Sequence, residues 1–593
     1  MNTLNIVKSS IIAIGLITMV SCVDLDPKPL SFYAPENTYN TKEGLEAGLN
    51  TCRKQIKWEW FGDAFSNMNP LVSEYAYSDM SVMGSPETKE IHNLEIQLTP
   101  ESSIDAYLRY WEYCWNGIKY ANTIVTRVET VEGISEQDKN ALLSEAYFHR
   151  SYWYYLLTHQ WGDVPLVLEE VAEPKIDFVS SSRLKILHQM KSDMEFAVQW
   201  LPKEVVRGGV NRAAGEHLLT KLYLAVGEFQ KAVDSATRCI NDNGLSLMKT
   251  RFGTNASNAS LDVFNDLFGE VNISDNANKE AIFVLQERYG LLGNVQGNGS
   301  QRMRNYVPYW SNGAAVRTPD GKQGTTYDTG PYDGYEQLAE LGRGISKIRP
   351  SNYHQYEIWK NCGSDMRRNN NNWYDISTLK YNRPASKGGS AEWFGKPVQR
   401  QYVTDTMRCY YSFPRVKVLI YKDDINKGKT PSGGFTDQYV FRLAETYLMR
   451  AEAYYWLNNI SKATSDVNEV RDRAKAPKLS AVTLDDILDE RARELFIEEH
   501  RKTELTRIAF IMAQLGKDGY NLKDFSKKNW YYDRVILKNN FYRKEYFYST
   551  NPFVIRPYHV LWPVPHTAIT ANTMGRINQN IGYPGAENNI PVE

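Results

Sequence analysis

Apolar side chains recur at helical spacing near the C-terminal end of this 593-residue chain. After a Thr483-x-x-Asp486 start, the apolar positions are Leu484, Ile487, Leu488, Ala492 and Leu495. This spacing places them on one face and predicts a helix with a capping-box start. In the first half, long stretches with few helix breakers predict helices at 41–60, 104–130 and 183–200.

A long aromatic helix is predicted between the second and third of these. Ser135-x-x-Asp138 resembles a helix start, and the segment ALLSEAYFHRSYWYYLLTHQ follows it. Gly162 and Pro165 come directly after the aromatic run and are typical helix stop signals. We therefore expect this helix to end near Trp161.

Two segments, 213–240 and 444–474, are similar to each other. In both, a Tyr lies nine residues before an Ala that follows a Lys, and a polar turn lies between: Tyr223 and Ala232 in the first, Tyr454 and Ala463 in the second. This resembles a tetratricopeptide helix-turn-helix unit. A generic helical hairpin is the alternative.

The region from about 250 to 440 has a different composition. It is rich in Asn, Gly and Tyr, with short β-like stretches at 281–289 and 415–421. A long, loop-dominated insertion in a helical frame is usually functional. We expect it to form the ligand-facing side.

The N-terminus reads as a bacterial lipoprotein signal. Residues 1–21 contain an apolar stretch, Ile11 to Val20, that is too short to span a bilayer. Cys22 follows Ser21 where a cleavage site belongs, which resembles a lipobox and makes Cys22 the expected site of acylation. Several acyl chains on one residue give a durable membrane anchor. Val23 to about Leu30 is then expected to be a tether.

Composition excludes several classes of function. With 69 basic and 70 acidic residues, nothing favours a nucleic-acid partner. The five cysteines beyond Cys22 are scattered without a CxxC pair, so we expect no metal site and at most one disulfide. HExxH, GxSxG and P-loop motifs are absent, and no cofactor is predicted.

Four motifs together resemble the SusD/RagB family of outer-membrane lipoproteins. They are AYFHRSYWYYLLTHQWGDVPLV (146–167), FRLAETYLMRAEAYYW (441–456) with NEVRDRA (468–474), ILDERARELFIEEHRKTELTR (487–507), and LWPVP (561–565) with QNIGY (579–583). Ile581 stands where the family often has Pro. Asp365-x-Arg367 is a further point of similarity.

The resemblance implies a mainly α fold, an α-α superhelix of about four tetratricopeptide-like units with a loop-rich, partly β ligand-facing region. We expect a helical N-terminal region at 22–245, and a C-terminal region at 246–593 with the insertion and the last repeat. It also implies a surface lipoprotein of the outer membrane that catches oligosaccharides and delivers them to a SusC-like TonB-dependent transporter. Some relatives take peptides instead, and this alternative stays open.

An enzyme is the least favoured reading. Glycoside hydrolysis needs a pair of carboxylates, and the densest acidic row is Glu490, Glu494, Glu498 and Glu499. Arginines and Lys502 alternate with these acids, so a salt-bridged helix face explains the row without catalysis. We therefore expect a binding protein and no enzyme.

Sugar binding needs flat aromatic rings beside polar side chains in loops. Two segments have this mixture, at 74–80 and 289–310, and Tyr327, Tyr332 and Tyr335 form a weaker third. For a single aromatic residue, packing in the core is the alternative. The candidate ligand-binding residues are Tyr75, Tyr77, Asp79, Tyr289, Arg302, Arg304, Tyr306, Tyr309 and Trp310.

Overall fold

The computed structural model describes residues 38–592 apart from 62–69, 86–90, 292, 295–299, 328–336, 421–433, 545 and 549–550. The predicted signal peptide, Cys22 and the predicted tether lie outside these residues, as do Tyr332 and Tyr335. Within the described part, no helix has the length and apolar character needed to cross a bilayer.

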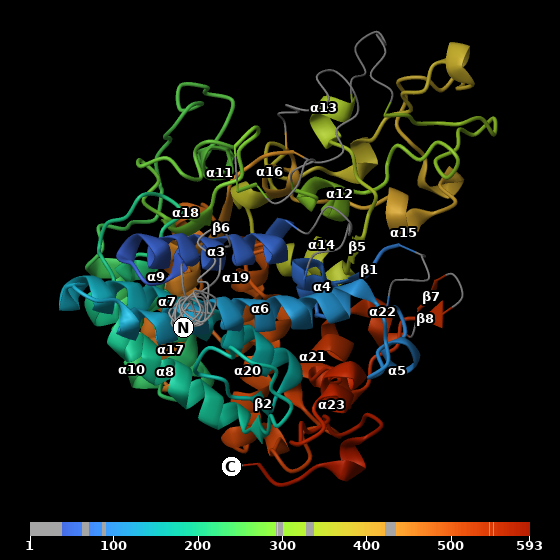
Figure 1. Ribbon diagram of the computed structural model, residues 1–593. Helices are drawn as coiled ribbons and strands as arrows, with labels where there is room; N and C mark the ends of the chain where they lie inside the picture. The colour runs from blue at the N-terminus through green and yellow to red at the C-terminus, as the bar shows by residue number, and fades with distance from the viewer. Residues whose placement is uncertain are drawn as a thin grey trace, which may run out of the picture.

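Long helices packed in series form the frame of the molecule (Figure 1). They pair as α3 with α6, α7 with α8, α9 with α10 and α17 with α18, which confirms the predicted tetratricopeptide-like arrangement. Helix α10 also packs on α17, so the chain resumes the stack after the insertion. The bounds are α3 (Lys42–Phe61), α6 (Asp105–Arg127), α7 (Glu136–Trp161), α8 (Arg183–Trp200), α9 (Arg212–Ala225), α10 (Phe229–Asn241), α17 (Leu443–Trp456) and α18 (Ile460–Arg473).

Local signals set the ends of the aromatic helix α7 as predicted. The Ser135 hydroxyl accepts a hydrogen bond from the Asp138 backbone N–H at 3.1 Å, and Gly162 ends the helix with a φ of 67°. Helix α6 lies close to α7 because Gly117 has no side chain. A Cβ there would lie 2.0 Å from Nε1 of Trp153.

The insertion between α10 and α17 contains short helices and the strands β4, β5 and β6. The predicted strand at 281–289 is confirmed over its first residues, which form β4. The expectation for 415–421 is wrong, since α16 (Arg415–Val418) is a helical turn that brings the buried Lys417 to Glu498. The antiparallel pairs are β1 (Ser81–Met83) with β5 (Ile348–Pro350), β2 (Val164–Pro165) with β3 (Ser180–Ser181), β4 (Ala281–Leu285) with β6 (Gln438–Arg442), and β7 (Phe547–Tyr548) with β8 (Asn551–Pro552).

Shorter helices complete the two sides of the frame. Figure 1 shows α12, α14 and α15 on the upper side and α23 on the lower side. The bounds are α4 (Pro70–Ala76), α12 (Arg302–Tyr306), α14 (Asn352–Gln355), α15 (Thr406–Cys409), α19 (Leu484–Glu494), α20 (Arg501–Gln514), α21 (Trp530–Lys538), α22 (Asn540–Arg543), α23 (His566–Ala571) and the 3-10 turns η2 (Glu357–Trp359), η3 (Met366–Arg368) and η6 (Arg400–Tyr402).

Helix α19 has the predicted capping box between Thr483 and Asp486. The charged row that follows is ion-paired as expected except for Lys502, which donates to the Val560 carbonyl at 3.0 Å. The row is buried in the protein and extends past the end of α19 into a turn before α20. All of Glu490, Arg491, Glu494, Glu498, Glu499, Arg501, Lys502, Glu504 and Arg507 are buried.

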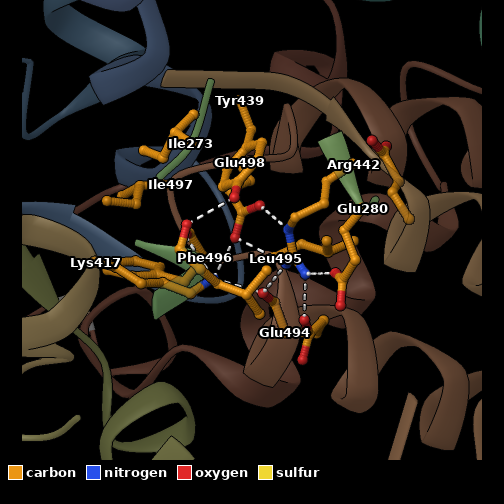
Figure 2. A network of polar contacts seen from close by, with 12 residues as sticks. Ile273, Glu280, Lys417, Tyr439, Arg442, Glu494, Leu495, Phe496, Ile497 and Glu498 are labelled. Carbon is orange, nitrogen blue, oxygen red and sulfur yellow. Dashed lines mark hydrogen bonds and ion pairs between the residues drawn. The ribbon is translucent and has the colours of Figure 1, made fainter. Parts of the chain in front are cut away.

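Arg442, at the end of β6, is the centre of this ion network (Figure 2). Its guanidinium lies 2.8 Å from Glu280, 2.7 Å from Glu494 and 2.6 Å from Glu498. Burial would lower the pKa of Arg442, but these three carboxylates raise it well above its usual value. Arg473 of α18 pairs with Glu280 and Glu494 as well.

Removing one partner of such a network leaves a buried charge without compensation, which costs about 3–5 kcal/mol. We expect Arg442→Met to lower the free energy of unfolding by about that amount in urea titrations followed by circular dichroism. Lys249→Met is the control, because Lys249 pairs with Glu469 and Asp472 at an exposed position and should change stability by about 1 kcal/mol or less. Equal losses in both variants would contradict this role of Arg442.

Candidate functional site

The structure buries the aromatic residues of the first predicted ligand segment. Tyr75 lies in α4, and its hydroxyl donates to the backbone carbonyls of Leu495 at 3.0 Å and Glu499 at 2.8 Å. Tyr77 donates to the carbonyl of Ile91 at 3.3 Å. Both tyrosines therefore satisfy carbonyl groups inside the protein, and the expectation that this segment is an exposed loop is wrong.

Asp79 is also a core residue. Its carboxylate lies 2.8 Å from Arg501 and 2.7 Å from Arg534. Burial would raise the pKa of Asp79, but the two guanidinium groups hold it far below its usual value. With its oxygens used by two arginines, Asp79 joins α20 to α21.

Most of the described residues of the second predicted segment are buried as well. The Tyr306 ring packs edge-on against Tyr75 and Phe496, with centroids 6.1 and 5.7 Å away. The Trp310 indole N–H donates to the Gly342 carbonyl at 2.7 Å. Arg302 is buried too and donates to Gln438. The expected exposure of Arg302, Tyr306 and Trp310 is wrong: the short helix α12 turns Arg302 and Tyr306 inward, and Trp310, beyond its end, is buried against the Gly342 carbonyl.

The other three predicted residues reach the surface. Tyr289 is 54% exposed and packs on Phe435. Arg304 and Tyr309 are half-buried, and the Tyr309 backbone N–H donates to the Arg408 carbonyl at 2.7 Å. A ligand contact for Tyr289, Arg304 and Tyr309 stays a prediction.

A groove of about 610 Å³ lies between α3, the loop at 205–209 and β4. Its lining has no aromatic side chain, so it offers no platform for a sugar ring. Three of its basic residues are already paired: Arg53 with Glu145, Lys57 with Glu287 and Arg288 with Asp437.

A smaller pocket of about 240 Å³ lies beside β2 and α23, on the lower side of Figure 1. Trp111 and Trp115, one turn apart on α6, line it together with Phe178 and Ile577. Two polar residues also line it: Lys175 pairs with Asp177 at 2.8 Å, and the Asn572 side-chain amide exchanges two hydrogen bonds with the backbone of Phe178. This pocket therefore suits an apolar group.

Exposed tyrosines mark a third surface, on the loop-rich side. Tyr356, between α14 and η2, is 50% exposed, and Tyr546 is 43% exposed. Both interact electrostatically with Arg349 of β5, as does Arg400. Tyr410, which follows α15, interacts with Arg400 and Tyr356 in the same way. We call Arg349, Tyr356, Arg400, Tyr410 and Tyr546 the Tyr356 patch.

Regular structure fixes the backbone of this patch. Arg349 lies opposite Val82 in the antiparallel pair β1–β5. Ser351 caps α14, and its backbone N–H donates to the Met80 carbonyl at 2.8 Å. Asp405 caps α15 in the same way, one turn before Tyr410. The tyrosines are thus presented by anchored turns.

The Tyr356 patch has the chemistry that a sugar ring requires. Within the described residues, the hydroxyls of Tyr356 and Tyr410 make no hydrogen bond to another protein group, so they remain available to a ligand. Burial, followed by the nearby Asp375 carboxylate, raises the pKa of Tyr410. Flat rings can cover the apolar face of a pyranose while the hydroxyls bond its rim. No cluster able to hold a metal ion occurs in the described part of the chain.

Comparison with known proteins identifies the family. The model described as "SusD family" matches residues 279–583, and the model "Starch-binding associating with outer membrane" matches residues 58–224. SusD-like protein P2 of Formosa agariphila is 26% identical over 511 residues, which cover 83% of this chain and 86% of that protein. The starch-binding protein SusD of Bacteroides thetaiotaomicron is 45% identical, over only 12% of this chain and 13% of its own length.

Solved structures agree with this assignment at the level of the fold. A laminarin-binding SusD-like protein superposes with a TM-score of 0.62 at 20% identity, covering 92% of this chain and all of that one. Surface glycan-binding protein A of Bacteroides uniformis gives 0.60 at 16% identity, covering 91% of this chain and 99% of its own. The chain belongs to the SusD family.

Sequence reasoning missed the Tyr356 patch, because its members lie far apart in the chain without a motif. The sequence-based prediction chose segments with many aromatic and polar residues. Such segments are equally typical of a core in which tyrosine hydroxyls form hydrogen bonds. A weak signal was present: Tyr356 and Tyr410 both follow short polar turns inside the Asn-, Gly- and Tyr-rich region.

The burial of Trp310 can be tested directly. Trp310→Ala removes a large buried side chain and should lower the free energy of unfolding by about 3–5 kcal/mol. Tyr289→Ala, at an exposed position, should change it by about 0.5 kcal/mol or less. Thermal unfolding followed by circular dichroism measures both. A Trp310→Ala protein as stable as the wild type would show that this side chain is not part of the core.

Proposed function

We propose that this protein is a surface lipoprotein that binds oligosaccharides and passes them to a SusC-like TonB-dependent transporter. The observation that carries the proposal is the Tyr356 patch, an exposed group of tyrosines with free hydroxyls in a SusD-family fold. The relatives support the choice of ligand: one solved structure is named as laminarin-binding and one curated relative as starch-binding.

Capture followed by release sets the expected strength of binding. Micromolar affinity corresponds to about −8 kcal/mol, which loads a transporter without trapping the cargo. A few aromatic contacts and rim hydrogen bonds on an open surface can supply that amount. An anchor at Cys22 would keep this surface beside the transporter at the outer membrane.

A role without catalysis fits the charged residues of the fold. The acidic residues that could have supplied a catalytic carboxylate pair form ion pairs with arginines instead. Glu490 pairs with Arg471 at 2.8 Å and Glu494 with Arg442 at 2.7 Å. Burial would raise the pKa of Glu490, but Arg367, Arg493 and Arg471 lower it to about 2. Glu490 is thus permanently ionised and enclosed, which suits neither a general acid nor a nucleophile for an external sugar.

A peptide ligand is the second candidate. The pocket lined by Trp111, Trp115 and Phe178 suits an apolar side chain, and Val171, Ile176 and Val179 are exposed in the loop beside it. Titration with a mixed peptide library, followed by the same titration of Trp111→Ala, tests it. Binding of peptides and of no glycan would replace the first proposal.

Tyr356→Ala should weaken glycan binding about five- to thirtyfold, since one stacked ring with its hydroxyl supplies roughly 1–2 kcal/mol. Isothermal titration against a panel of oligosaccharides, including laminarin and starch fragments, measures the dissociation constants. Tyr289→Ala is the matched control, because Tyr289 is equally exposed on a different loop.

The two variants separate the two surfaces. Loss of binding in Tyr289→Ala, with Tyr356→Ala unchanged, would move the site to the 289 loop. Unchanged binding in both would show that neither tyrosine contacts the glycan.

The anchor and the transporter need a test in cells. Cys22→Ala should abolish labelling with a fatty-acid analogue and shift the protein from the membrane to the soluble fraction. Ser21→Ala keeps a small residue before the cysteine and should leave labelling intact. Purification of the wild-type protein from detergent-solubilised membranes should recover a TonB-dependent barrel; its consistent absence would count against the proposed partner.

A further inference from the structure

Arg349 of β5 is half-buried, and the protein satisfies its guanidinium only in part. Its Nε and Nη1 atoms are fully buried and have no hydrogen-bond partner. The guanidinium lies over the rings of Tyr411, at 4.8 Å, and Phe541, at 5.8 Å. Among the residues that the structure describes, no carboxylate pairs with it. Burial lowers the pKa of Arg349 to about 10, and the positive charge of Arg400 acts in the same direction.

Several fully buried arginines have their charge compensated by carboxylates, whereas Arg183 and Arg302 bond only neutral side chains, His159 and Gln438, in the described structure. Arg442 contacts three carboxylates. Arg501 is paired with Asp79 and Glu499, and Arg507 with Glu452 and Glu504. A half-buried cation without an anion costs folding free energy, and groups of this kind concentrate at functional sites.

Two more arginines without a carboxylate partner lie within electrostatic range of residues of the Tyr356 patch. Arg400 is exposed and makes no ion pair within the described residues. Arg368 lies over the Trp373 ring at 4.1 Å, and it interacts electrostatically with Tyr356. Its Nη1 atom is buried and has no hydrogen-bond partner in the described structure.

The nearby acids do not neutralise these cations. Asp375 is exposed and lies within electrostatic range of Arg368 and Tyr410. Its side chain accepts the backbone N–H of Ser377 at 3.0 Å as the cap of a 3-10 turn. Glu357, beside Tyr356, is exposed to solvent. Three arginines thus face two carboxylates, and neither carboxylate forms an ion pair with any of them.

We propose that the Tyr356 patch selects acidic glycans, an inference that rests on the proposed glycan-binding function. Arg349 and Arg400 then bind a carboxylate or sulfate on a sugar that stacks against Tyr356. The Nη2 atom of Arg349 is not one of the enclosed atoms, so it can donate to such an oxyanion together with the exposed Arg400 guanidinium. The ligand then supplies the anion that Arg349 lacks. A neutral glycan would leave that charge unpaired and would gain less from the same contact.

The basic groove beside α3 is the competing site for an anion. Most of its cations are paired, but Lys54 is exposed and has no partner in the described structure. Lys54→Met therefore removes one positive charge at the competing surface, and it serves as the matched control for the arginine variants.

Isothermal titration with three probes tests the proposal: oligogalacturonate, the same oligosaccharide with its carboxyl groups reduced to alcohols, and a sulfated galactan oligosaccharide. We expect the wild type to bind at least one anionic probe about tenfold or more tighter than the reduced one. Arg349→Met and Arg400→Met should each remove this preference, while Arg349→Lys should keep part of it and Lys54→Met all of it. The anionic probe that binds tighter identifies carboxylate or sulfate as the group recognised.

Equal affinity for charged and reduced probes would overturn the proposal, and so would a preference that survives in both arginine variants. The proposed function would still stand in either case, provided that Tyr356→Ala weakens binding. Binding of no glycan at all would reject both. Arg349→Met should fold, because no carboxylate loses its partner, and thermal unfolding checks this. If it does not fold, Arg400→Met decides the matter, since Arg400 is exposed.

Discussion

The buried ion network around the turn between α19 and α20 holds the two halves of this protein together. Its members come from distant parts of the chain. Glu280 lies directly before β4, Arg442 in β6, Arg473 in α18 and Glu494 in α19. Each enclosed charge is costly to desolvate and is stable only in contact with its partners. The insertion and the helical stack can therefore close only in one relative arrangement, the one in which every charge is paired.

The turn itself depends on side chains from elsewhere. Ile497 has a φ of 57°, an uncommon conformation for a β-branched residue, so its surroundings must hold it in place. Tyr75 bonds the carbonyls of Leu495 and Glu499, and Lys417 bonds those of Glu494 and Phe496. Tyr75, which the sequence indicates as a ligand-binding residue, is therefore needed to hydrogen-bond backbone carbonyls that would otherwise be buried without a partner.

The difference between what sequence predicted and what it missed follows from the range of the interactions. Helix ends at Ser135 and Thr483 were predictable because a cap and its partner lie three residues apart. The repeats were predictable because each unit is a local hairpin. Asp79, in contrast, is buried by Arg501, 422 positions along the chain, and no local pattern reports such a pairing. The inward turn of Trp310 likewise depends on the carbonyl of Gly342.

The proposed ligand surface was located by polar groups that lack a partner within the fold. Many buried tyrosines of this protein donate hydrogen bonds and many buried arginines are ion-paired, so a surface polar group without a partner differs from them. Tyr356 keeps a free hydroxyl in solvent, and Arg349 keeps a charge over aromatic rings without an anion. A hydrogen-bond or ion-pair partner for either group inside the fold would stabilise the protein, but it would also remove the contact that a ligand could make. A ligand that pairs with these groups gains binding free energy, and a ligand that leaves them unpaired does not, which is the physical basis of specificity.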